Sequence, residues 1–312
     1  MAFVGKIAYL VLFPGILFIL LAGVLARAVS TGMGAALSGG DRRGLAASAA
    51  FMFSAPDQEA ISTGGALYAV VWLAPLVKLV ALAWVSCIIF GFFNADLVLL
   101  FALLLVAGGA DLLTAFLSPN PLVMRQAWGE AASLLAWAVP FAFVCAAVAL
   151  RSGQVSVKAV IDTQVTGGVL LASASGGAVA RVGGALTLIA AISAGVALAR
   201  LRPFGRGYAA GSPGGMLDDV SGTPLAMFAG AGAAALFVVP LVIVMLFFAG
   251  PAGNWYEIIF WALKVLGVLV LLLLVDLVSA RAGSRTVTRW GVGAMGFIAL
   301  LGLVLTWIGV SG

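Results

Sequence analysis

The apolar run Leu73–Leu105, LAPLVKLVALAWVSCIIFGFFNADLVLLFALLL, decides the fold class of this chain. A helix that crosses a bilayer needs about 20 apolar residues. The run covers most of two such helices, for which we expect the ranges 66–91 and 95–117. Apolar runs of similar length lie on both sides of it, so these two helices belong to a larger set of membrane spans.

The composition of the whole chain agrees with a polytopic membrane protein. Of its 312 residues, 64% are hydrophobic and 9% are charged, whereas a soluble domain has about 25% charged residues. We therefore predict an all-α protein with a single transmembrane domain, residues 1–312, that crosses the membrane about eight times. The expected spans are 7–28, 66–91, 95–117, 131–150, 178–199, 224–249, 255–278 and 290–310.

The distribution of arginine predicts the orientation, because cytoplasmic loops of membrane proteins carry an excess of basic residues. With the N-terminus outside, the inward-facing segments hold Arg27, Arg42, Arg43, Arg125, Arg200, Arg202, Arg206, Arg281, Arg285 and Arg289. The outward-facing segments hold Lys6, Arg151 and Lys158, with Arg181 near a helix end. We therefore expect both termini outside the plasma membrane, and cytoplasmic loops at about 29–65, 118–130, 200–223 and 279–289.

The sequence gives no support for a redox centre or a catalytic site held by this chain alone. It has no histidine, and its two cysteines, Cys87 and Cys145, stand apart in apolar runs. Zinc, haem and iron–sulfur sites need clusters of such ligands. The short motifs of serine hydrolases, P-loop proteins and zinc peptidases are missing as well. We expect no cofactor and no metal in this chain.

Charged residues within the expected spans are the main candidates for function. Each costs about 2.5–3.5 kcal/mol on the insertion scale. Lys78, Asp111 and Lys264 lie deep in their runs, whereas Asp276 lies near the end of its run. A buried charge needs a partner or water, so Lys78 or Lys264 facing Asp111 or Glu130 would form an internal pair. Such a pair serves either as part of a proton or ion path or as a structural contact that fixes the helix register.

A long charged segment separates two of the expected spans. It reads RLRPFGRGYAAGSPGGMLDDVSGTPLAMF, from Arg200 to Phe228. Its charged residues are Arg200, Arg202, Arg206, Asp218 and Asp219. Because the arginines can pair with acidic groups on another protein, we expect these five residues to dock a soluble partner.

Four stretches, in this order, resemble one family of membrane proteins. They are Leu73–Leu105, Ser118–Phe141 (SPNPLVMRQAWGEAASLLAWAVPF), Arg202–Phe228 and Leu263–Trp290 (LKVLGVLVLLLLVDLVSARAGSRTVTRW). They are similar to subunit 1 of respiratory complex I, a membrane subunit. They are equally similar to the corresponding subunits of formate hydrogenlyase and other group 4 membrane-bound nickel–iron hydrogenases.

The chain departs from the pattern of this family at several acidic positions. Trp137 and Ala138 stand where the family has Tyr-Glu, and Ala115 lies near the place of an aspartate found in the hydrogenases. The family is thought to use these acids to carry protons. Asp219 stands at the glutamate of a Glu-Tyr-Ser-Gly motif. The candidate ion path that remains consists of Lys78, Asp111, Glu130, Asp219, Lys264 and Asp276.

The resemblance implies a non-catalytic membrane-anchor subunit of a complex I-like, ion-translocating oxidoreductase. Such a subunit docks a soluble arm with iron–sulfur and hydrogenase-like subunits and links it to antiporter-like membrane subunits. Iron–sulfur clusters and a nickel–iron centre would belong to those partners. The divergent first cytoplasmic loop favours the group 4 hydrogenase or formate hydrogenlyase type. The alternatives are the quinone-cavity subunit of NADH-quinone oxidoreductase and a stand-alone secondary transporter.

Overall fold

The computed structural model describes residues 2–38, 65–167, 177–201, 220, 222–248, 255–279 and 284–311, and these segments are almost entirely helical. Their elements are α1 (Ala2–Val11), α2 (Ile16–Ser38), α4 (Gly65–Ile89), α5 (Leu97–Phe116), α6 (Pro121–Ser152), α7 (Val157–Gly167), α8 (Gly177–Leu198), α9 (Gly222–Phe247), α10 (Trp255–Val278), α11 (Ser284–Arg289), the π-helical segment η1 (Trp290–Met295) and α12 (Gly296–Ser311). Within these described residues, eight helical stretches are long and apolar enough to cross a membrane. The expected all-α fold with about eight spans is confirmed.

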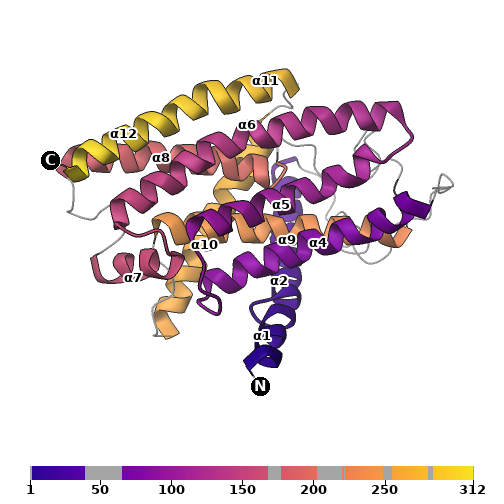
Figure 1. Cartoon of the computed structure of the whole chain (residues 1–312), viewed down its shortest axis with the longest axis horizontal. Coiled ribbons are helices and arrows are strands. Elements are labelled where there is room, and N and C mark those ends of the chain that lie inside the picture. Colours follow the sequence, from indigo (N-terminus) through magenta and orange to yellow (C-terminus); the bar gives the residue numbers. More distant parts are fainter. Residues whose placement is uncertain are drawn as a thin grey trace.

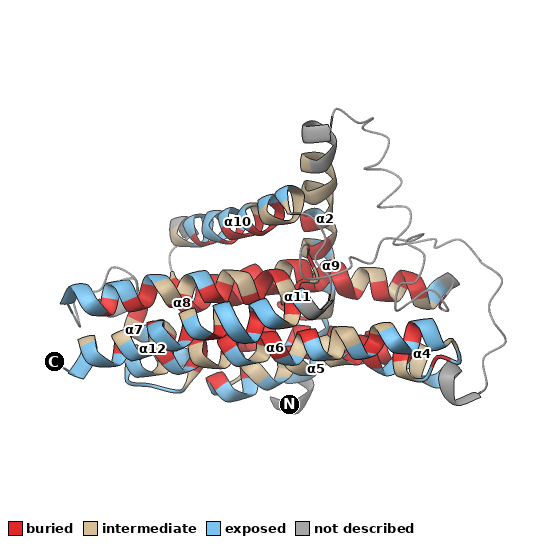
Figure 2. Ribbon diagram, turned by 90° about the horizontal axis from the view of Figure 1, so that it is seen from above, coloured by how far each residue is buried: buried red, intermediate tan, exposed pale blue. Residues whose placement is uncertain are grey.

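The long helices form a bundle around α9 (Figure 1). Helices α2, α4, α8 and α10 all pack against α9. Its side chains are buried along most of its length, and Figure 2 shows it as mainly red. Many exposed apolar side chains of the other spans lie on α10 and α12, which is the pattern expected of surfaces that face lipid or other membrane subunits. The core of the bundle is thus centred on one helix.

Small residues allow the closest helix crossings. A Cβ atom built on Gly183 of α8 would lie 2.6 Å from the Thr306 hydroxyl and 2.8 Å from the Gly302 carbonyl, both on α12. A Cβ on Gly302 would in turn lie 2.8 Å from the methyl group of Thr187. The two helices therefore cross through reciprocal Gly-x-x-x-Thr motifs, a pattern typical of membrane helix pairs.

Several expected boundaries differ from the structure. The expected loops at 29–65 and 279–289 are helical in part, because α2 continues to Ser38 and α11 occupies Ser284–Arg289. The first span is not one helix from 7 to 28, because the chain breaks between α1 and α2 at Leu12–Gly15. Pro14 has no N–H to donate within a helix, and any side chain on Gly15 would collide with the backbone of Leu10. The break follows from these two residues.

The expected loop at 118–130 is mostly helical, since α6 begins at Pro121 rather than near 131. The Asn120 side chain accepts a hydrogen bond of 3.0 Å from the backbone N–H of Leu122. An asparagine at the N-cap followed by proline at the first helical position is a strong helix start. The prediction of a loop was wrong because these two residues begin a helix here instead of breaking one.

Side chains from two other elements close the end of α9. The buried amide of Gln164 on α7 donates to the carbonyl oxygens of Met245 (3.1 Å) and Leu246 (3.0 Å). Lys264 of α10 donates to the carbonyl of Phe248 at 2.8 Å. The last carbonyls of a helix have no partner within it, so these contacts stabilise the end of the central helix and fix α7 against it.

Candidate functional site: a buried charge cluster

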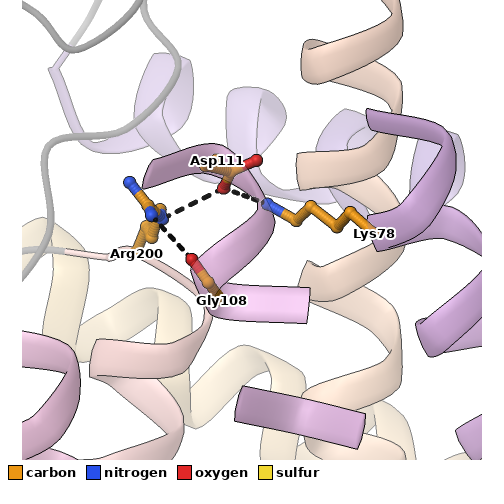
Figure 3. A network of polar contacts seen from close by, with 4 residues as sticks. All are labelled: Lys78, Gly108, Asp111 and Arg200. Atoms are coloured by element: carbon orange, nitrogen blue, oxygen red, sulfur yellow. Dashed lines mark hydrogen bonds and ion pairs between the residues drawn. The ribbon is translucent and has the colours of Figure 1, made fainter. Parts of the chain in front are cut away.

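Lys78 of α4 and Asp111 of α5 form an ion pair inside the bundle (Figure 3). The Lys78 Nζ donates to the Asp111 Oδ2 at 2.6 Å. The Asp111 side chain is fully buried, and that of Lys78 is only 4% exposed. This is one of the internal pairs that the sequence allowed. Its burial explains how both charges are accommodated within apolar helices, since an unpaired buried charge would be strongly destabilising.

A third charge, from Arg200, the second residue after α8, joins this pair. The Arg200 Nε lies 3.3 Å from the same Asp111 Oδ2. The guanidinium also donates to the backbone carbonyl of Gly108 at 3.2 Å, as Figure 3 shows. Lys78, Asp111 and Arg200 form what we call the charge cluster. It ties α4, α5 and the end of α8 together.

The backbone at the end of α8 directs Arg200 into the cluster. The N–H of Arg200 donates to Ala197 O, and the N–H of Leu201 donates to Val196 O. These two hydrogen bonds define a Schellman motif, in which the residue after the cap adopts a left-handed conformation. Arg200 has a φ of 54° accordingly. The buried side chain of Leu201 completes the motif.

An arginine is an unusual residue for this position. Glycine is preferred there because it has no Cβ, and a side chain costs about 1–2 kcal/mol in the left-handed region. Such strain persists where the surroundings impose it, and it often marks a functional position. Here the ion pair with Asp111 and the hydrogen bond to Gly108 offset the cost. The contacts of the guanidinium therefore account for an arginine where the backbone alone favours glycine.

A small cavity of about 20 Å³ adjoins the cluster. It lies between α5, α6 and the end of α8, and Arg200 contributes to its wall. On α6 it is lined by Glu130, Ser133, Leu134 and Trp137. These four positions share one face of a helix, because residues three, four and seven apart are neighbours. Glu130 therefore lines the same cavity as Arg200 of the cluster.

The other sequence candidates lie elsewhere or outside the described residues. Lys264 contacts the C-terminal end of α9. The N-terminal end of α9 is the one that packs near the cluster, and it lies about 20 residues, or roughly 30 Å, away along the helix. Asp276 interacts electrostatically with Arg27 of α2. Arg202, Arg206, Asp218 and Asp219 belong to the part of the chain that the structure does not describe. The structure therefore brings together Lys78, Asp111 and Arg200, with Glu130 across the cavity.

Sequence reasoning assigned Arg200 to a docking surface, but its guanidinium points into the bundle. Its side chain is 11% exposed. One sequence signal could have indicated the inward position of Arg200: it comes directly after the last apolar turn of α8. A cation at the C-terminus of a helix also interacts favourably with the helix dipole. The partner, Asp111, is 89 residues earlier in the chain, so no local pattern links the two.

The fold and the cluster define a polytopic membrane protein with a charged site inside its helix bundle. Residues 6–307 match the family model described as NADH dehydrogenase. The chain therefore belongs to this family, which is that of subunit 1 of complex I.

A comparison with solved structures supports the same assignment at the level of the fold. The chain is similar to a chain of an archaeal respiratory complex, the membrane-bound sulfane sulfur reductase. The TM-score is 0.80 and the sequence identity 19%, over 98% of this chain and 99% of the other. A search of the curated proteins found no match. The protein is a membrane subunit of a complex I-like respiratory complex.

Proposed function

We propose that this chain is the non-catalytic membrane anchor on which the soluble iron–sulfur arm of its complex docks. The observation that carries the proposal is the position of the described residues on either side of the segment 202–219. On one side, Arg200 belongs to the charge cluster. On the other side, Val220 is buried against Ala74, Leu225 and Phe228. Ala74 precedes Lys78 by one helical turn on α4.

Both flanks of this segment are therefore fixed at the end of the bundle that holds the charge cluster. The segment carries Arg202, Arg206, Asp218 and Asp219, which suit a charged protein surface. A soluble arm bound there would lie over the cluster. We further propose that the arm contains iron–sulfur and hydrogenase-like subunits, and that antiporter-like subunits cover part of the exposed apolar helices.

The cofactors of the reaction are proposed to lie in the partner subunits. This chain has no histidine and only two cysteines, both buried in the bundle.

We place the complex with the group 4 hydrogenase or formate hydrogenlyase type, because the first long polar segment, at 29–65, departs from the family pattern associated with quinone. We place the chain in the plasma membrane, and the arginine distribution supports an orientation with both termini outside.

Charge reversal tests the docking proposal. The double variant Arg202→Glu with Arg206→Glu is expected to release the soluble arm while the chain still inserts. The control is Lys158→Glu with Arg181→Glu, which reverses two exposed charges on the side expected to face outward. Co-purification of the partner subunits from membranes is the measurement. Retention of the arm by the first variant would show that the segment does not dock it.

A second variant tests the proposed ion path. Asp219→Asn is expected to leave the complex assembled but to reduce ion translocation in reconstituted vesicles. We propose that the path continues to Glu130 and the charge cluster, and we keep Lys264 and Asp276 as more distant candidates. Unchanged translocation by an assembled Asp219→Asn complex would remove Asp219 from the path.

A further inference from the structure

Within the part of the chain that the structure describes, the charge cluster holds two cations and one anion. Lys78 and Arg200 are cationic, and both contact one oxygen of a single carboxylate, that of Asp111. A net charge held in a low-dielectric interior is costly unless further charges or hydrogen bonds compensate it. The acidic residue that lines the same cavity as Arg200 is Glu130. A carboxylate at this place would make the set of four residues neutral.

The cavity between Arg200 and Glu130 has the size and the polarity of a water site. A buried water needs about 10–15 Å³ and two to four polar partners. The cavity measures about 20 Å³, and three residues with polar side chains, Glu130, Ser133 and Arg200, are among those that line it. A guanidinium has five N–H groups in one plane, so it can contact Asp111, Gly108 and a water in the cavity together.

We propose that one ordered water occupies this cavity and joins the Glu130 carboxylate to the Arg200 guanidinium. Glu130 is then the fourth member of the cluster. A continuous hydrogen-bonded chain runs from buried Lys78 through Asp111, Arg200 and the water to half-buried Glu130. The water connects α6 to the three elements that the cluster already joins. In the proposed ion path, Glu130 is the residue through which the buried charges exchange protons with their surroundings.

The water is tested directly by a cryo-EM map of the whole complex in lipid nanodiscs, at a resolution that shows ordered waters. We expect one density in the cavity, within hydrogen-bonding distance of Glu130 and Arg200. Ser133→Ala removes a hydroxyl but keeps the space, so the density should remain. Ser133→Val fills the space, so the density should disappear. A cavity without density in the unaltered chain would overturn the proposal.

The membership of Glu130 in the cluster is tested by a double-mutant cycle on the thermal unfolding of the complex. Glu130→Gln and Arg200→Gln should each lower the unfolding temperature, and the two together by less than the sum. Arg125→Gln, an exposed change on the same helix, should be additive with Arg200→Gln. Additive shifts for Glu130 and Arg200 would refute their connection even with a water present.

Both measurements are independent of the proposed docking and ion translocation. The water density and the thermal shifts can be as expected while the segment 202–219 fails to dock a partner. The inference rests on the proposed function only in the role it gives to Glu130. If the Glu130→Gln complex does not assemble, the maps of the unaltered chain and of the Ser133 variants still decide whether the water exists.

Discussion

Replacing Arg200 by glycine and by alanine separates its two properties, the left-handed backbone and the buried guanidinium. Both variants lose the contacts to Asp111 and to the Gly108 carbonyl. Only glycine also relieves the backbone, because alanine keeps a Cβ at a φ of 54°. The structure therefore predicts that the alanine variant is less stable than the unaltered chain and also less stable than the glycine variant.

The magnitudes follow from the contacts that are lost. Removing Arg200 loses its ion pair with Asp111 and its hydrogen bond to the Gly108 carbonyl. The loss of a hydrogen bond that involves a charged group costs about 1.5–3 kcal/mol. Glycine at a left-handed position recovers about 1–2 kcal/mol of strain. We expect Arg200→Ala to cost about 1.5–3 kcal/mol and Arg200→Gly to cost about 1–2 kcal/mol less.

Unfolding of the purified chain by titration with SDS, followed by tryptophan fluorescence, measures these differences. Eight tryptophans give the signal. Equal stability of the glycine and alanine variants would show that Arg200 is not held in the left-handed region. An Arg200→Ala variant as stable as the unaltered chain would show that the contacts to Asp111 and Gly108 contribute little.

Three further predictions concern the bundle and its orientation. Gly183→Val places a side chain where even a Cβ would lie 2.6 Å from a hydroxyl on α12, so the yield of folded protein in detergent should fall. Gly267→Val, at a position where an added Cβ would meet no atom within 4 Å apart from its chain neighbours and its own helix backbone, should not reduce it. Gln164→Leu leaves two carbonyls at the end of α9 without their amide donor, and SDS titration should show a loss of about 1–3 kcal/mol. Single cysteines introduced at residues 45 and 215 should react with a membrane-impermeant thiol reagent only after the membrane is opened, and labelling of intact cells would refute the predicted topology.

The membrane spans could be predicted from the sequence because hydropathy is a local property. Each span is a mainly apolar run, and a backbone in lipid must satisfy its hydrogen bonds within the same segment. The positions of α4, α5, α8, α9 and α10 therefore agree with the expected ranges within a few residues. The start of α6 was missed, because Asn-Pro is a signal both for a turn and for a helix N-terminus.

The candidate site was only partly predictable. The sequence identified Lys78, Asp111 and Lys264 as costly charges that need partners, since burial of a charge within an apolar run is visible from the run itself. It gave Glu130 only as a candidate partner for a lysine. The choice of partner is not a local property. Lys264 and Lys78 were equivalent candidates in the sequence, and the packing of α4 against α5 brings Lys78 to Asp111.

The sequence alone determined that this is an all-α membrane protein with charges inside its spans, because length, apolarity and charge are properties of each segment by itself. The tertiary structure decided how those charges are grouped. Arg200 reaches Asp111 because a Schellman motif turns the chain at the end of α8. Glu130 reaches the same region because α6 begins ten residues earlier than its apolar run indicates. Both depend on backbone geometry and on helix packing between distant segments, which no single segment encodes.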